Sequence, residues 1–201
     1  MLDAWARRLI DPPLHRVGRV LAELGVGADT VTLLGFAAGV ASFPALIWQQ
    51  DTLALVCIVL NRVADGLDGA IARVRGATDL GGFLDIVLDF IVYAGVPVAF
   101  AIGRPEHALA AAILVFSFVG TMASFLAFAI IAAKHGLTSS RRGAKSIYYL
   151  RGIAEGCETI LFLVLICLFP GAFAWFAGVF AVACWLTTVG RVAAAVGAFG
   201  R

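Results

Sequence analysis

The chain has 201 residues, of which 62% are hydrophobic and 14% are charged, and its formal net charge is +2. This composition excludes an ordinary water-soluble globular domain and indicates an all-α integral membrane protein. The small net charge says little about partners, and we expect no nucleic-acid partner.

Residues 1–24 are expected to form an amphipathic helix beside the membrane. One side of such a helix is apolar and comprises Leu14, Val17, Leu21 and Leu24. Charged residues and two prolines interrupt the segment, which therefore lacks the continuous apolar core of a cleavable signal. A positively charged leader that only sets the orientation of the protein is an open alternative.

Residues 25–201 are expected to form one membrane domain with six transmembrane helices. A helix needs about 20 mainly apolar residues to cross a bilayer. Apolar runs near this length occur at 31–49, 52–72, 82–103, 107–133, 147–169 and 172–195. Together they fill most of the chain, so we expect a polytopic protein without a soluble domain.

The distribution of lysine and arginine predicts the orientation of this domain. If both termini are cytoplasmic, the outer connections contain only Arg104, whereas the inner side holds Arg7, Arg8, Arg16, Arg19, Arg73, Arg75, Lys134, Arg141, Arg142, Lys145 and Arg201. Basic residues concentrate on the cytoplasmic side of membrane proteins. We therefore expect a multi-pass protein of a bacterial inner (cytoplasmic) membrane, with both termini and the site described next on the cytoplasmic side.

Acidic residues concentrate where the second expected span meets the third. Asp65 and Asp68 are three residues apart on one helix, and Asp85 and Asp89 are four apart on the next, so each pair shares a helical face. Like charges at such close range repel unless a cation lies between them. Carboxylate oxygens favour Mg²⁺ or Mn²⁺ over softer metals. The sequence therefore predicts a divalent metal site near the inner membrane surface.

Small and basic residues beside the acids indicate where an anionic ligand would lie. Gly66 and Gly69 each cost roughly 1 kcal/mol inside a helix relative to alanine, so they indicate a close approach to the backbone. Tight helix packing is the alternative. Arg73 lies two turns beyond Asp65 and suits a phosphate or diphosphate. An arginine that only sets orientation is the alternative there, and we prefer that interpretation for Arg75.

These residues resemble the signature of the CDP-alcohol phosphatidyltransferase family, DxxDGxxAR followed by GxxxDxxxD. The chain reads Asp65-x-x-Asp68-Gly69-x-x-Ala72-Arg73 and then Gly81-x-x-x-Asp85-x-x-x-Asp89. The six-span layout and the N-terminal helix extend the resemblance over nearly the whole chain. There are two departures. The spacer between the two halves is shorter than in the family, and of an upstream Pro-Asn-x-x-Thr signature only Thr32 is kept.

The resemblance implies an enzyme of phospholipid synthesis that transfers a phosphatidyl group from CDP-diacylglycerol to an alcohol and releases CMP. It implies a site for two Mg²⁺ or Mn²⁺ ions whose ligands are Asp65, Asp68, Asp85 and Asp89, with Asp89 also as the proton acceptor. The residues expected to contact the CDP-linked donor are Thr32, Gly66, Gly69, Arg73 and Thr78. We also expect a homodimer.

The second half of the chain is expected to form the acceptor pocket. Candidate contacts are Lys134, Arg151, Glu155 and Arg191. Arg151, Glu155 and Glu158 share a helical face, so an internal ion pair with a structural hydrogen bond is an alternative. Inner-facing cations make glycerol 3-phosphate the leading acceptor. A neutral, zwitterionic or lipid acceptor of the phosphatidylglycerol, choline, serine or inositol type stays open.

An ion or metal transporter is the competing class, because acids inside a membrane also mark ion paths. Such a path should continue to the outer face, but beyond Asp89 the third expected span has only Tyr93 as a polar residue. The acids therefore end in a blind pocket. A catalytically silent scaffold is a third alternative, and the four aspartates argue against it.

Overall fold

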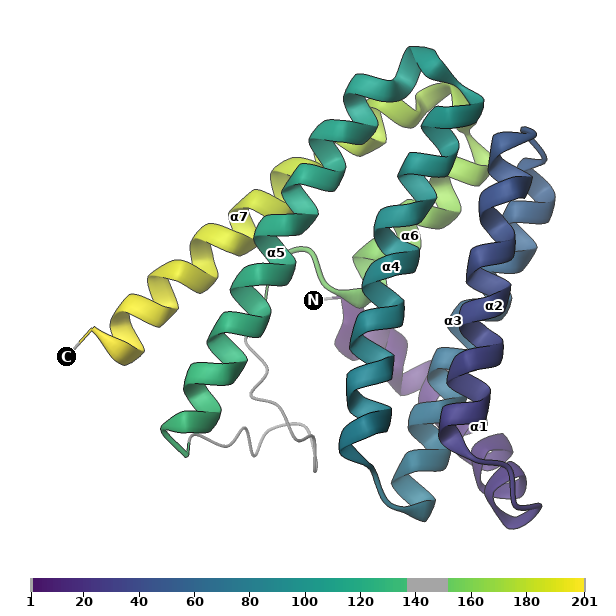
Figure 1. The fold of residues 1–201 in the computed structure, drawn as a ribbon, viewed down its shortest axis with the longest axis vertical. Helices are drawn as coiled ribbons and strands as arrows, with labels where there is room; N and C mark the ends of the chain where they lie inside the picture. The colour runs from purple at the N-terminus through teal and green to yellow at the C-terminus, as the bar shows by residue number, and fades with distance from the viewer. Residues whose placement is uncertain (1, 137–151, 201) are drawn as a thin grey trace.

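The computed structural model describes residues 2–136 and 152–200, and these residues are helical apart from short connections. The helices are α1 (Leu2–Glu23), α2 (Ala28–Ile47), α3 (Asp51–Arg75), α4 (Asp79–Gly103), α5 (Ala108–Lys134), α6 (Gly156–Leu168) and α7 (Phe173–Phe199), with 3₁₀ turns η1 (Pro105–His107) and η3 (Pro170–Ala172). In Figure 1, α2, α3, α4 and α6 stand side by side, while α5 and α7 form a parallel pair that leans away from α4 towards the lower end. The all-α prediction is confirmed for the described residues.

Among the described residues, four helical segments have the length and composition to cross a bilayer. They are α2, α4, η1 with α5, and η3 with α7. Helix α3 has 25 residues but carries several charged side chains. Helix α6 has 13 residues. At a rise of about 1.5 Å per residue, α6 covers roughly 20 Å of a hydrocarbon core about 30 Å thick. Four of the six expected spans thus fit a crossing helix, and a crossing by α3 and α6 stays a prediction.

The fifth expected span, 147–169, begins too early. Residues 147–151 lie outside the described residues, and residues 152–155 are not helical. The Thr187 hydroxyl on α7 accepts hydrogen bonds from the backbone N–H groups of Ile153 and Ala154, at 2.9 and 2.8 Å. The Glu155 and Glu158 side chains then form a reciprocal capping box at the first turn of α6. These polar contacts start the helix at Gly156, within the apolar run.

The turn between α3 and α4 sets up the functional end of the molecule. Gly76 ends α3 with a φ of 97°, a conformation that favours glycine. Thr78 is the N-cap of α4, and its hydroxyl accepts a hydrogen bond from the Gly81 N–H at 3.0 Å. The chain therefore reverses direction between the two halves of the acidic motif. Helix α2 packs closely against both α3 and α4, which approach each other less closely.

Helix α1 packs against α3 and α6 in the lower half of the molecule (Figure 1). A Cβ atom on Gly18 would lie 2.5 Å from the Cβ atom of Ala70, so the missing side chain of Gly18 lets the two helices approach closely at this point. The helix predicted for residues 1–24 is therefore present. Its position at the membrane surface stays a prediction.

The upper half of the bundle holds an aromatic core. Phe100 of α4 stacks on Phe173 of α7 with ring centroids 4.2 Å apart, and Phe162 of α6 stacks on Phe180 of α7 at 5.1 Å. Above this core Arg104 forms a buried ion pair with Asp51, with Nη2 and Oδ2 2.7 Å apart. The packed end of the molecule is thus opposite the acidic end.

Candidate active site

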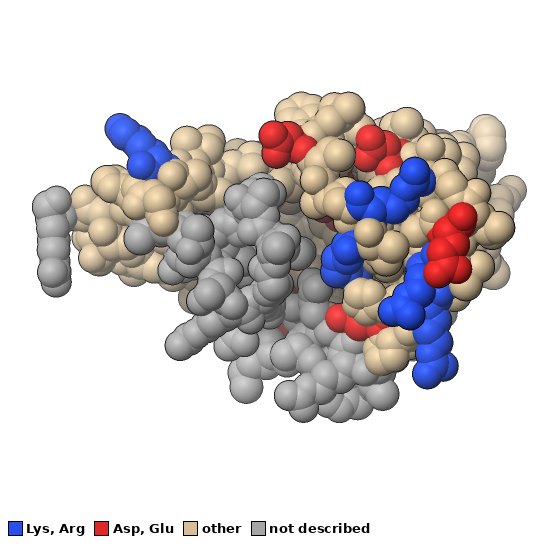
Figure 2. All heavy atoms as spheres, turned by 90° about the horizontal axis from the view of Figure 1, so that it is seen from below, with Lys and Arg blue, Asp and Glu red and all other residues tan. Residues whose placement is uncertain are grey.

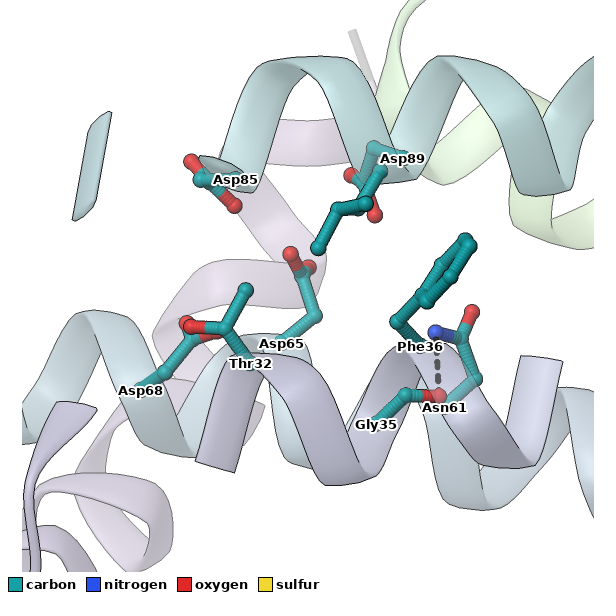
Figure 3. Close-up of a pocket in the computed structure, with 9 residues that line it drawn as sticks. Thr32, Gly35, Phe36, Asn61, Asp65, Asp68, Asp85 and Asp89 are labelled. Carbon is teal, nitrogen blue, oxygen red and sulfur yellow. Dashed lines mark hydrogen bonds between the residues drawn. The ribbon is translucent and has the colours of Figure 1, made fainter. Parts of the chain in front are cut away.

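Three of the four predicted carboxylates meet in one place. Asp65 and Asp68 of α3 and Asp85 of α4 each offer an oxygen atom within 4.8 Å of the others. Figure 3 shows the side chains from the two helices pointing into the space between them, with Asp89 beside them. Three carboxylates this close repel one another unless a cation neutralises them, and an all-oxygen set suits Mg²⁺ or Mn²⁺. The residues present therefore fit a divalent metal ion.

A third helix contributes to this pocket. The Thr32 hydroxyl on α2 donates a hydrogen bond to Oδ2 of Asp68 at 2.6 Å. Asp68 is only 6% exposed, so this bond fixes a carboxylate that has little contact with solvent. The residues that line the pocket are Thr32, Gly35, Phe36, Asn61, Asp65, Asp68, Asp85, Leu88 and Asp89. Thr32 was predicted as a contact to the nucleotide-linked donor, and the structure places it as a hydrogen-bond partner of a predicted metal ligand.

Asp89 is held by a residue for which the sequence gave no role. Arg62 of α3 donates from Nη2 to Oδ1 of Asp89 at 2.5 Å and from Nη1 to Oδ2 at 3.1 Å. Tyr93, one turn after Asp89, accepts from Arg62 Nη1 at 2.6 Å and donates to Asp89 Oδ2 at 3.2 Å. The only sequence signal for Arg62 was an arginine inside an apolar span, one turn before Asp65.

Asn61 completes this network and anchors it to α2. Its side-chain oxygen accepts from Nε and Nη2 of Arg62 at 2.8 and 2.6 Å, while its amide nitrogen donates to the Gly35 carbonyl at 2.9 Å. Figure 3 marks this last bond. Asn61 and Arg62 are both buried. Helices α2, α3 and α4 are therefore tied together one turn deeper than the three converging carboxylates.

The two glycines of the predicted donor groove have different surroundings. A Cβ atom on Gly66 would lie 2.6 Å from Cδ1 of Leu14, so Gly66 makes room for α1. At Gly69 the nearest atom is Nη1 of Arg73, at 3.5 Å. Arg73 itself is exposed at the end of α3. The packing alternative therefore describes Gly66, while Gly69 and Arg73 border open space next to the acids.

Two other residues of this end have structural contacts. Thr78 caps α4, as described above. Arg75 donates from Nη1 to the carbonyls of Gly25 and Val26, at 2.8 and 3.0 Å, and so ties the end of α3 to the connection between α1 and α2. Figure 2, which views the molecule from below, shows the charged side chains gathered over this end.

The acceptor candidates lie away from the lining of the acidic pocket as far as the described residues go. Lys134 is exposed at the end of α5. Arg191 is 6% exposed, donates to the Thr121 carbonyl at 2.8 Å and lies over the Phe125 ring. Glu155 caps α6 and accepts from the Gly152 N–H at 2.9 Å, while the alternative of an ion pair with Arg151 stays untested. Arg151 and the basic residues Arg141, Arg142 and Lys145 lie outside the described residues.

Residues 26–192, which include every element of this site, match the sequence model of the family described as CDP-alcohol phosphatidyltransferase. The chain belongs to this family. As a CDP-alcohol phosphatidyltransferase it is a transferase of substituted phosphate groups, which confirms the enzyme class predicted from the motif. The transporter alternative loses its support.

Several curated proteins are similar to this phosphatidyltransferase. It is 53% identical to Inner membrane protein YnjF of Escherichia coli (strain K12) over 193 residues, which cover 96% of this chain and 94% of that protein. It is 33% identical over 98 residues to an archaetidylinositol phosphate synthase of Pyrococcus horikoshii, covering 48% and 52% of the two chains. It is 30% identical over 89 residues to a phosphatidylcholine synthase of Pseudomonas aeruginosa, covering 40% and 37%.

Solved structures share the fold. A crystal structure of the phosphatidylinositol phosphate synthase of Mycobacterium tuberculosis with CDP-DAG bound matches with a TM-score of 0.70 at 22% identity, covering 89% of this chain and 91% of that one. A second structure of that enzyme, with manganese and citrate, matches at 0.69 and 24% identity, covering 89% and 87%. The family depends on a divalent metal ion, and the three converging carboxylates are where this chain would hold one.

Proposed function

We propose that this phosphatidyltransferase joins the phosphatidyl group of CDP-diacylglycerol to an alcohol and releases CMP, with glycerol 3-phosphate as the leading acceptor. The observation that carries the proposal is the pocket itself, where Asp65, Asp68 and Asp85 converge and Asp89 points into the same space. One structural neighbour was crystallised with CDP-DAG bound, which supports this donor class.

In the proposed reaction, the acceptor oxygen forms a bond to the phosphatidyl phosphorus while the bond from phosphorus to the CMP oxygen breaks, and its electron pair leaves with CMP. Asp89 accepts the proton that the alcohol loses. Asp65, Asp68 and Asp85 would hold Mg²⁺ or Mn²⁺, and we propose two ions with Asp89 as a further ligand. Such ions, when bound, neutralise the diphosphate and the departing CMP.

Residues at the rim of the pocket would bind the donor. Gly69 leaves the backbone of α3 open next to Arg73, so a phosphate group can approach both the helix and the guanidinium. We propose that Gly69 and Arg73 contact the diphosphate. Thr32 orients Asp68 for the metal through its hydrogen bond. We propose that Thr78 contacts the nucleotide as well as capping α4. For Gly66 the contact with Leu14 favours packing over a direct donor contact.

We propose that the acidic end faces the cytoplasm and that α3 and α6 complete six spans in a bacterial inner membrane. In this arrangement residues 1–24 lie at the membrane surface, and residues 25–201 form the catalytic domain. The exposed basic residues Arg16, Arg19, Arg73 and Arg75 support the orientation. The diacyl tails would stay in lipid while the nucleotide stays in water. We also propose a homodimer, which native mass spectrometry would test.

The acceptor is the open part of the reaction. Glycerol 3-phosphate is proposed because the inner side carries several cations, with Lys134, Arg151, Glu155 and Arg191 as candidate contacts. A second candidate is an inositol phosphate, because one relative is an archaetidylinositol phosphate synthase and the structural neighbour, in two crystal structures, is a phosphatidylinositol phosphate synthase. The similarity to the phosphatidylcholine synthase of Pseudomonas aeruginosa supports a choline-type acceptor.

The deciding experiment is an acceptor screen with purified protein, Mg²⁺ or Mn²⁺ and radiolabelled CDP-diacylglycerol. The acceptors are glycerol 3-phosphate, inositol phosphate, serine, choline and phosphatidylglycerol, and the readouts are CMP release and the labelled lipid product. We expect CMP release with a phosphorylated acceptor. Release only with choline, serine or phosphatidylglycerol would overturn the glycerol 3-phosphate proposal, and no release with any acceptor would overturn the proposed reaction.

A further inference from the structure

The guanidinium of Arg62 has a complete set of hydrogen-bond partners. An arginine side chain has five N–H groups arranged in a planar fork. In Arg62, Nε and one N–H of Nη2 donate to Asn61, the other N–H of Nη2 donates to Asp89, and Nη1 donates to Asp89 and Tyr93. The side chain is buried, and Asn61 is in turn bonded to Gly35 of α2. The fork therefore has one orientation, which its neighbours fix.

The carboxylate of Asp89 is left with one open position. A carboxylate offers roughly four acceptor sites, two on each oxygen. Oδ2 accepts from Arg62 Nη1 and from the Tyr93 hydroxyl, while Oδ1 accepts from Arg62 Nη2. Among the described residues nothing else donates to Asp89. Asp89 lines the pocket, so a hydroxyl proton or a metal ion in the pocket could reach the remaining acceptor site on its Oδ1.

We propose that Arg62 is a positioning residue for Asp89, with Asn61 and Tyr93 as its supports. The inference rests on the proposed function, in which Asp89 accepts the proton of the acceptor alcohol. The bidentate pair fixes the plane of the Asp89 carboxylate, and the Tyr93 hydroxyl occupies the second site of Oδ2. Arg62 thus directs one oxygen of Asp89 at the incoming alcohol without touching the substrate itself.

A second effect of Arg62 distinguishes this role from simple packing. Its Nη1 atom lies 3.6 Å from Oδ2 of Asp65, so a fixed positive charge stands next to the converging carboxylates. A cation at this distance opposes the binding of another cation. Removing Arg62 should therefore strengthen divalent metal binding while it weakens catalysis. A residue that only held the fold would weaken both together.

The test compares Arg62→Met and Arg62→Lys with wild type in detergent or nanodiscs. For Arg62→Met we expect kcat to fall about 100-fold, the size of a general-base contribution, with the KM for CDP-diacylglycerol changed by less than about threefold. Mn²⁺ affinity, measured by titration calorimetry without substrate, should stay equal or rise. Arg62→Lys restores the charge but not the bidentate fork, so we expect wild-type Mn²⁺ affinity with kcat still at least about tenfold low.

Arg104→Met is the matched control because it also removes a buried arginine that is paired with an aspartate, at the other end of the molecule. It should lower the unfolding temperature and leave kcat and Mn²⁺ affinity of the folded enzyme unchanged. Tyr93→Phe is the second variant, since it keeps the ring and removes only the hydroxyl. We expect it to fold and to lose about tenfold in kcat at constant KM.

Wild-type kcat in Arg62→Lys and Tyr93→Phe would overturn the positioning role while the proposed reaction stands. Parallel losses of kcat and Mn²⁺ affinity in all three site variants would also overturn it, because that is the result of a structural role. If the wild-type enzyme itself releases no CMP with any acceptor, the proposed function fails first, and the positioning role fails with it.

Discussion

In the part of the chain that the structure describes, a buried arginine is hydrogen-bonded to an aspartate at each end of the molecule, Arg62 to Asp89 and Arg104 to Asp51, and the two pairs differ in how many of their polar atoms have hydrogen-bond partners. At the acidic end, all five N–H groups of Arg62 have partners, and two of these bonds reach Asp89. At the opposite end, Arg104 makes one hydrogen bond to Asp51, at 2.7 Å. There, Nη1 of Arg104 and Oδ1 of Asp51 are buried without a hydrogen-bond partner among the described residues.

The surroundings explain the difference. Arg104 lies over the Phe100 ring, 4.4 Å from its centroid, above the aromatic core, so packing and charge neutralisation account for its contacts. Arg62 lies among polar partners from α3 and α4 beside the converging carboxylates, and its partner Asn61 is bonded to Gly35 of α2. A buried ion pair alone is weak evidence for function or stability. A pair in which every arginine donor is bonded, and two of the bonds hold one carboxylate of a pocket, is evidence for a required geometry.

The largest difference in turnover is expected between variants of the two aspartates, Asp89 and Asp51. Asp89→Asn removes the proposed proton acceptor, and general-base catalysis contributes about 10²–10⁴-fold. We expect kcat to fall by about 1,000-fold in the CMP-release assay. The matched variant Asp51→Asn removes the same charge at the other end and should keep kcat within about twofold of wild type, because no reacting group is near it. Near-wild-type turnover by Asp89→Asn would refute the base assignment and leave the family assignment intact.

The two ends should also respond differently when both partners of a pair are removed. Breaking a buried pair costs about 3–5 kcal/mol, so Arg104→Met should lower the thermal unfolding midpoint clearly. The double variant Arg104→Met with Asp51→Leu replaces the pair by apolar groups and should recover most of that loss. Combining Arg62→Met with Asp89→Asn should leave turnover as low as Asp89→Asn alone. Recovery of turnover in that double variant would contradict the distinction between the two ends.

A smaller effect is expected from the hydroxyl that supports the acidic cluster. Thr32→Val removes the 2.6 Å hydrogen bond to Asp68 while keeping the shape of the side chain. A hydrogen bond to a charged group contributes about 1.5–3 kcal/mol, so the dissociation constant for Mn²⁺ should rise about tenfold. At saturating metal, kcat should stay within about threefold of wild type. Thr121→Val, which removes a hydroxyl bonded to its own helix, is the control and should leave Mn²⁺ binding unchanged.

The sequence predicted those parts of the site that follow from spacing along one helix. Asp65 and Asp68, three residues apart, and Asp85, in the following helix, converge because a helix places such residues on one face and the Gly76 turn reverses the chain. The residues that hold two of the aspartates, Thr32 for Asp68 and Arg62 for Asp89, could not be predicted from the sequence. Thr32 lies 36 positions before Asp68, and Arg62 lies 27 before Asp89, so only the packing of α2, α3 and α4 brings them together.

Helix boundaries were predictable only where composition changes with structure. The fifth expected span began too early because the apolar run continues through residues that Thr187 and the Glu155–Glu158 capping box hold outside the helix. Gly66 and Gly69 look equivalent in the sequence, since both follow an aspartate within one helix turn. Helix α1 covers Gly66 and leaves Gly69 open, and the local sequence around the two glycines does not predict where α1 packs.

Within the acidic end, Gly66 has a packing role against Leu14 and Gly69 has a proposed role in donor binding. Substitutions at these two glycines are expected to have the smallest effects. Gly69→Ala adds a Cβ whose nearest neighbour is 3.5 Å away, so the protein should fold normally, and the KM for CDP-diacylglycerol should rise about fivefold as the methyl group crowds the diphosphate. Gly66→Ala places its Cβ 2.6 Å from Leu14, so its main effect should be a lower unfolding temperature at nearly unchanged KM. Steady-state kinetics and thermal unfolding of the two variants separate these outcomes. A raised KM for Gly66→Ala with unchanged stability would place the donor against the α1 side of α3, because only a ligand on that side would meet the added methyl group.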